Sequence, residues 1–153
     1  MITAIRKILL VEDSPNDAEL TLEALAEHRL ANEMVHLRDG AEALDYLHAR
    51  GQFTDRGNDL PALVLLDLKM PKVDGLEVLR QMKGDEQLKT IPVVILTSSR
   101  EESDLVKSYQ LGVNAYVVKP VDFSEFVEAV KQLGAFWAVV NEPPAGRLPG
   151  SGL

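Results

Sequence analysis

The chain has 153 residues, 46% of them hydrophobic, which suits one domain of ordinary size with its own core. It has no cysteine, so disulfides and thiolate metal sites are excluded. A formal net charge of −8 disfavours binding to nucleic-acid phosphates, and no apolar stretch approaches the ~20 residues that span a bilayer. With no signal-peptide pattern, we expect a cytoplasmic protein.

Short apolar runs alternate with amphipathic segments along the chain. The runs are Lys7–Val11, Met34–Leu37, Ala62–Leu66, Pro92–Leu96 and Ala115–Val118. Near-continuous Val, Ile and Leu is typical of strands covered on both faces. The segments between indicate helices at about 15–29, 40–50, 75–83, 101–110 and 123–140. This alternation predicts a doubly wound α/β sandwich with a parallel five-stranded sheet, and 2-1-3-4-5 is the expected strand order.

Local signals mark the ends of several predicted helices. Ser14 precedes Pro15, so the serine can cap a helix whose first residue is proline. Gly51 and Gly84 follow helical patterns, where we expect the left-handed conformation that ends a helix. The folded domain should cover residues 1–140, and the Pro/Gly-rich residues 141–153 should form a tail.

Polar residues stand at the ends of the predicted strands. Glu12 and Asp13 follow the first strand, Asp67 follows the third, Thr97 ends the fourth and Lys119 follows the fifth. The carboxyl ends of parallel strands share one edge of the sheet, where open α/β sheets place their sites. We therefore expect these side chains to meet.

The chemistry of this set suits phosphoryl transfer. Three carboxylates in close contact repel one another unless a cation joins them, and an all-oxygen donor set favours Mg²⁺. Lys119 and Thr97 can both donate to phosphoryl oxygens. Asp67 can act as the nucleophile that forms an aspartyl phosphate.

At this point the sequence resembles the receiver domains of bacterial response regulators, which have a flavodoxin-like fold. The resemblance rests on VEDS (11–14), LLDLKMPKVDG (65–75), ILTS (95–98) and NAYVVKP (114–120), and it covers about residues 6–137. It implies a single-domain member of a two-component phosphorelay, phosphorylated by a histidine kinase. After the last predicted helix we see no room for a DNA-binding domain, so the output should be a phosphorylation-dependent protein–protein interaction.

The resemblance also assigns roles to individual residues. It implies that Asp67 is the phosphoacceptor, with Mg²⁺ held by Asp13, by Asp67, by the main-chain carbonyl of Lys69, and by Glu12 through water. Glu12 departs from many relatives, which have aspartate there; this should alter the metal's outer shell without abolishing binding. It further implies a switch made of the Thr97 hydroxyl and the Tyr116 ring, a phosphate-binding Lys119, and a cis Lys119–Pro120 bond.

A narrower resemblance links the chain to regulators that partner bacterial and cyanobacterial phytochromes. It rests on GQFTDRGNDLPALVLLDL (51–68) and GAFWAVVNEPP (134–144), and it implies a bacteriophytochrome as the kinase. The last predicted helix ends in a segment that is apolar on every side. Either the tail or a second subunit must cover it, and we favour a homodimer through the last strand and helix, with Phe136, Trp137 and Val140 in the interface.

Two other functions are compatible with parts of this pattern. An Asp-nucleophile, Mg²⁺-dependent phosphohydrolase also uses an aspartate at a strand end, but it typically has a second aspartate two residues later as acid/base. Lys69 occupies that position here. A scaffold that no longer takes a phosphoryl group would not need the set Asp13, Asp67, Thr97 and Lys119. We therefore expect a receiver that catalyses only its own phosphotransfer and dephosphorylation.

Overall fold

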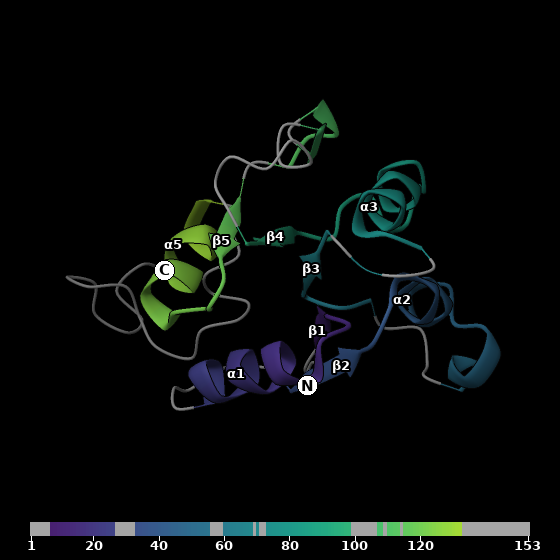
Figure 1. Cartoon of the computed structure of the whole chain (residues 1–153). Helices are drawn as coiled ribbons and strands as arrows, with labels where there is room; N and C mark the ends of the chain where they lie inside the picture. The colour runs from purple at the N-terminus through teal and green to yellow at the C-terminus, as the bar shows by residue number, and fades with distance from the viewer. Residues whose placement is uncertain are drawn as a thin grey trace, which may run out of the picture.

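Five parallel strands form the centre of the computed structural model (Figure 1). The structure describes residues 7–26, 33–55, 60–68, 70, 73–98, 107–108, 110–113 and 115–132. The strands are β1 (Ile8–Val11), β2 (Met34–Leu37), β3 (Leu63–Asp67), β4 (Val93–Thr97) and β5 (Tyr116–Val118). They pair in the order β2-β1-β3-β4-β5, all parallel, which confirms the predicted fold class and strand order.

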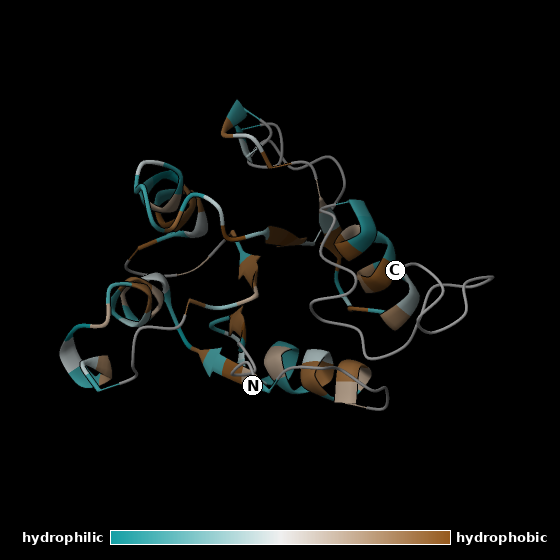
Figure 2. Ribbon diagram, turned by 180° about the vertical axis from the view of Figure 1, so that it is seen from behind, coloured by the Kyte–Doolittle hydropathy of each residue, from teal (hydrophilic) through white to brown (hydrophobic). Residues whose placement is uncertain are grey.

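Helices cover both faces of this sheet. The described helices are α1 (Pro15–Ala26), α2 (Gly40–Leu47), α3 (Gly75–Lys83) and α5 (Phe123–Gln132), with a short 3-10 turn, η1 (Gly51–Phe53), after α2. Helices α1 and α5 lie on one side of the sheet, and α2 and α3 lie on the other (Figure 1). Seen from behind, the strands and the inner sides of the helices are the most hydrophobic parts (Figure 2).

The alternation of side chains along each strand divides the core into two clusters. Leu9, Val64 and Ile95 pack with α2 and α3, whereas Leu10, Leu65 and Val94 pack with α1 and α5. The inner strands β1, β3 and β4 are buried at every position, while the edge strands β2 and β5 are partly exposed. This is why the inner strands appear in the sequence as unbroken apolar runs.

The helix starts depend on side-chain caps. The Ser14 hydroxyl accepts a hydrogen bond of 3.2 Å from the Asp17 amide, as predicted for the start of α1. The Asp74 carboxylate accepts one of 2.9 Å from Glu77 and caps α3. The prediction for Gly84 is wrong, because its φ of −88° is ordinary right-handed backbone. Gly51 does have a positive φ, of 61°, but it opens the 3-10 turn.

Gly75 allows α3 to begin directly against the end of β3. A Cβ atom at this position would lie 2.3 Å from the main-chain oxygen of Asp67 and 2.6 Å from the Cα of Leu68. The Gly75 amide also donates a 2.9 Å hydrogen bond to the Leu68 carbonyl. Any side chain at this position would collide with the backbone, so only glycine allows α3 to start this close to the main chain that follows Asp67.

Several predictions fall on parts of the chain outside the described residues. These are most of the helix expected at 101–110, the main chain of Lys69, the interface residues Phe136, Trp137 and Val140, and the tail at 141–153. In the part of α5 that is described, Phe126 and Val130 are fully buried, as expected for an apolar stripe facing the sheet.

Candidate functional site

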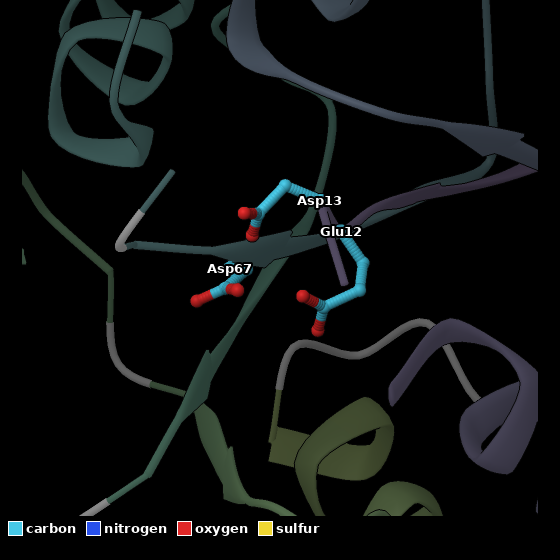
Figure 3. Close-up of side chains that lie close together, drawn as sticks. All are labelled: Glu12, Asp13 and Asp67. Carbon is cyan, nitrogen blue, oxygen red and sulfur yellow. The ribbon is translucent and has the colours of Figure 1, made fainter. Parts of the chain in front are cut away.

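Three carboxylates meet at the carboxyl edge of the sheet. Glu12 and Asp13 come directly after β1, as predicted. Asp67 is the last residue of β3, whereas the sequence analysis placed it one residue beyond the strand. One oxygen of each lies within 4.8 Å of the others, and Figure 3 shows the three side chains converging on one space. The prediction that these acids gather at one place is confirmed.

Main-chain and side-chain hydrogen bonds stabilise Glu12 in its buried position. The Glu12 amide donates 3.0 Å to the Leu37 carbonyl and so extends the pairing of β1 with β2. Its own side chain has no exposed surface, and Oε2 accepts a hydrogen bond of 3.2 Å from the Ser14 amide. Asp67 is 6% exposed and Asp13 is exposed, so the cluster opens to solvent on the side of Asp13.

Lys119 places one ammonium group among three carboxylates. Its Nζ lies 3.1 Å from Glu12 Oε1, 3.1 Å from Asp17 Oδ2 and 3.3 Å from Asp67 Oδ2. An ammonium group has three hydrogens to donate, so these three acceptors use its full capacity. The lysine is therefore held beside Asp67 by the charge-assisted hydrogen bonds that it donates to Glu12 and Asp17.

This arrangement changes the pKa values of Glu12 and Lys119. Burial, followed by the hydrogen bond and negative charge of Asp67, raises the pKa of Glu12 to about 7. Burial alone lowers the pKa of Lys119, but the hydrogen bond to Asp17 and the charges of Asp67 and Glu12 outweigh it and raise that pKa above its usual value. Lys119 therefore stays charged at neutral pH, whereas Glu12 gains or loses its proton near that pH.

Thr97 lies at the same edge, one strand away from Asp67. It is the last residue of β4, it is 1% exposed, and its carbonyl accepts a 2.8 Å hydrogen bond from the Lys119 amide. Asp67 is paired in register with Leu96, the residue before Thr97. The pairing of its neighbour Leu96 with Asp67, and its own bond to the Lys119 amide, therefore place Thr97 at the site. The expected cis Lys119–Pro120 bond is present.

Tyr116 begins β5 and is half-buried. Its side chain packs against the core cluster on the α2 and α3 face. With Val118, Ser124 and Glu128, it also borders a hollow of about 300 Å³ beside α5. Tyr116 thus contacts the core and also borders an open space, one strand beyond Thr97.

Sequence reasoning missed two neighbours of the acidic cluster. Asp17 lies in the first turn of α1, where an acid is usually explained by the helix dipole, yet it pairs with Lys119. His36 lies on β2, and its Nε2 is 2.8 Å from the Glu12 carbonyl oxygen. The one available signal was the position of Asp17 in the first turn of α1, directly after the acidic pair that follows β1.

The donor atoms of the cluster fit a divalent cation. All three are carboxylate oxygens, without sulfur or imidazole, which is the donor set of hard ions such as Mg²⁺, Mn²⁺ and Ca²⁺. Two of the three residues are buried, so their charges need a partner that water does not provide. Asp13, Asp67 and Glu12 are the residues that would hold such an ion.

Fold and site together define a receiver, and a family comparison agrees. Residues 8–131 match the model of the response regulator receiver domain, so the chain belongs to that family. The response regulator Rcp1 of Synechocystis is 41% identical over 138 residues, which cover 90% of this chain and 92% of Rcp1.

Solved structures of receivers superpose closely on this chain. The bacteriophytochrome response regulator AtBRR is 62% identical, with a TM-score of 0.85 over 92% of this chain and all of AtBRR. The Mn²⁺-bound form of Rcp1 gives a TM-score of 0.70 at 40% identity, over 92% of this chain and 99% of that one. The phosphorylated cyanobacterial phytochrome response regulator RcpA gives 0.70 at 45% identity, over 88% of this chain and 94% of that one.

Proposed function

We propose that this receiver accepts a phosphoryl group on Asp67 with the help of Mg²⁺, and that it signals through a protein–protein contact that depends on phosphorylation. The observation that carries the proposal is the position of Asp67, which lies in a cluster of three carboxylates and 3.3 Å from the Lys119 ammonium. The site thus combines a nucleophile, ligands for a cation and a fixed positive charge. The reported forms of two relatives, phosphorylated RcpA and Mn²⁺-bound Rcp1, support it.

In the proposed reaction, a carboxylate oxygen of Asp67 attacks the phosphorus of a phosphohistidine on the kinase. The new O–P bond forms as the N–P bond breaks, and its electron pair stays on the imidazole nitrogen. Lys119 donates to a phosphoryl oxygen from its position beside Asp67. Mg²⁺, held by Asp13, Asp67, the Lys69 carbonyl and, through water, Glu12, would supply the charge that neutralises the phosphoryl oxygens.

The proposed switch consists of Thr97 and Tyr116. A phosphoryl group brings a charge of about −2 to the sheet edge, and the Thr97 hydroxyl is the donor expected to turn toward it. The burial of Thr97 supports this role, because movement of a packed residue affects its neighbours. Tyr116 packs against the core and borders the hollow beside α5, and in the proposed switch its ring moves between these two surroundings.

The proposed donor is a sensor histidine kinase, specifically a bacteriophytochrome. Support comes from AtBRR, a bacteriophytochrome response regulator that is 62% identical to this chain. Phosphotransfer from a panel of purified histidine kinases, with a bacteriophytochrome among them, tests this. Preferred transfer from the phytochrome kinase is expected, and faster transfer from an unrelated kinase would contradict the partner while leaving the receiver function in place.

We further propose that residues 1–140 form the receiver and residues 141–153 a tail, and that the receiver forms a homodimer through its last strand and helix. The apolar sequence around Phe136, Trp137 and Val140 supports the dimer. Sedimentation at tens of micromolar, with and without beryllofluoride, tests it. A monomer under both conditions would exclude the dimer.

Intact mass spectrometry after incubation with acetyl phosphate and Mg²⁺ tests the central proposal. We expect a gain of one phosphoryl group that is lost in Asp67→Asn and on removal of the metal. No gain, or a gain that persists in Asp67→Asn, would contradict it. Multiple-turnover hydrolysis of p-nitrophenyl phosphate would instead support the phosphohydrolase, although Lys69 occupies the position of its usual acid.

A further inference from the structure

Lys119 has a third partner that neither the metal cluster nor the proposed reaction uses. Asp17 Oδ2 lies 3.1 Å from the ammonium nitrogen, as close as Glu12 and closer than Asp67. Asp17 does not belong to the group of acids whose oxygens lie within 4.8 Å of one another. It is therefore a carboxylate that holds the lysine without being placed to hold the cation.

The ordinary explanations for an acid at this position do not account for the contact. In a capping box, the acid of the first helical turn reaches back to the amide of the capping residue. Here the Ser14 amide already donates to Glu12 Oε2 at 3.2 Å. Favourable interaction with the helix dipole needs only the charge, not a partner 102 residues away in sequence.

A bound metal and a phosphoryl group would affect the three hydrogen bonds of Lys119 differently. Glu12 and Asp67 are cation ligands, so a bound metal draws on the same oxygens that now accept from the lysine. In the metal-free site all three hydrogens of the ammonium are already used, whereas a phosphoryl group on Asp67 brings new acceptor oxygens that need them. Asp17 is the one of the three partners that a metal would not draw away, and its side chain is 39% exposed, so it is the partner that the phosphoryl group has to displace.

We propose that Asp17 is a positioning residue that competes with the phosphoryl group for the Lys119 ammonium and so favours the unphosphorylated state. This inference rests on the proposed phosphorylation of Asp67. The charge of Asp17 also acts in the same direction, since it opposes the approach of a dianion to the site. Removing that charge while keeping the shape of the side chain should therefore favour the phosphorylated form.

The test is the affinity for beryllofluoride, a phosphoryl mimic, at saturating Mg²⁺. A half-exposed ion pair contributes modestly, so Asp17→Asn should tighten beryllofluoride binding about two- to five-fold relative to the unmodified protein. Asp17→Ser, which cannot replace the contact, should behave in the same way. Melting curves of both variants, recorded in parallel, show whether α1 is retained.

Two controls separate the lysine contact from a general effect of charge. Glu23→Gln removes a charge from an exposed position further along α1 and should leave the affinity unchanged. The second control adds Asp17→Asn to a Lys119→Met protein, titrated to millimolar beryllofluoride. There Asp17→Asn should no longer tighten binding, because the ammonium group for which Asp17 and the mimic compete is absent.

Each result decides the matter. No beryllofluoride binding by the unmodified protein would overturn the proposed function and this inference together. Normal binding by the unmodified protein, with unchanged or weaker binding by Asp17→Asn, would overturn the inference alone. The same gain in Glu23→Gln, or an undiminished gain in the Lys119→Met background, would show a charge effect that does not pass through the lysine.

Discussion

The main-chain amide of Lys119 donates a 2.8 Å hydrogen bond to the carbonyl oxygen of Thr97. This bond extends the pairing of β4 and β5 by one step beyond the end of β5 at Val118. The side chain of the same lysine reaches Asp67 at the end of β3, on the other side of β4. The proposed phosphoacceptor, hydroxyl and amine are thus joined through neighbouring strands and not through a loop.

Lys119→Met tests how far the lysine stabilises the acids when no metal is present. The main-chain bond to Thr97 survives the change, but Glu12, Asp17 and Asp67 lose their shared cation. We expect the free energy of unfolding in chelator to fall by about 1–3 kcal/mol, with much of the loss restored by Mg²⁺. Urea unfolding with and without Mg²⁺ measures this, and an increase in stability in chelator would contradict the assigned role.

The stability of the metal-free protein should depend on pH through Glu12. Its pKa is about 7 in the folded chain against 4.5 for an unperturbed group, so the folded state binds the proton more tightly. The resulting stabilisation is complete below pH 4.5. It declines as the pH rises from 4.5 to about 7, and it is lost above that.

Glu12→Gln isolates this contribution from the other titrating groups. Between pH 5 and pH 8, the unmodified protein in chelator should lose up to ~3 kcal/mol more stability than the variant does. Chemical unfolding at several pH values gives both curves. Parallel curves for the two proteins would show that Glu12 titrates as an ordinary carboxyl group.

Binding of Mg²⁺ should depend on the carboxylates of the cluster and not on acidic residues in general. Asp13→Asn removes the ligand exposed to solvent, so it should weaken Mg²⁺ binding at least ten-fold with little effect on the fold. Glu86→Gln, at an exposed position after α3, is the control and should bind normally. Calorimetric titration compares them, and equal affinities in Asp13→Asn and the control would exclude the proposed ligand set.

Two glycines at opposite ends of α3 offer a matched comparison. A Cβ at Gly75 would lie 2.3 Å from the Asp67 oxygen, whereas at Gly84 the nearest atom would lie 3.4 Å away. Gly75→Ala should therefore cost about 1–3 kcal/mol and slow phosphorylation of Asp67, because the backbone carrying that residue must shift.

Gly84→Ala should change stability by less than about 1 kcal/mol in either direction and leave phosphorylation unaffected. Thermal unfolding and acetyl phosphate kinetics on the two variants give both comparisons. Equal phosphorylation rates in Gly75→Ala and Gly84→Ala would mean that the close approach at Gly75 does not position Asp67.

The sequence predicted the sheet and the acidic edge because both depend on local patterns. Buried strands such as β3 and β4 appear as continuous apolar runs, and polar residues at their ends must share one edge of a parallel sheet. Errors of one residue occurred where apolar and polar side chains meet. Asp67 was placed after its strand, although its main chain still pairs with Leu96.

Contacts between distant segments could not be predicted in the same way. The ion pair of Asp17 with Lys119 depends on the angle at which α1 crosses the sheet, and the contact of His36 with Glu12 depends on the register of an edge strand. Gly84 shows another limit, since glycine is compatible with helix ends of either backbone conformation. The path of the chain through all three positions is set by packing.

The three-way pairing of Lys119 has a consequence for the protein in a cell short of magnesium. Because an internal ammonium already offsets the buried acids, the empty receiver keeps its fold and should escape the proteases that remove unfolded chains. If the proposed dependence on Mg²⁺ holds, starvation for the ion would silence the molecule without lowering its abundance. Once the ion returns, signalling would resume from the existing pool, with no delay for new synthesis.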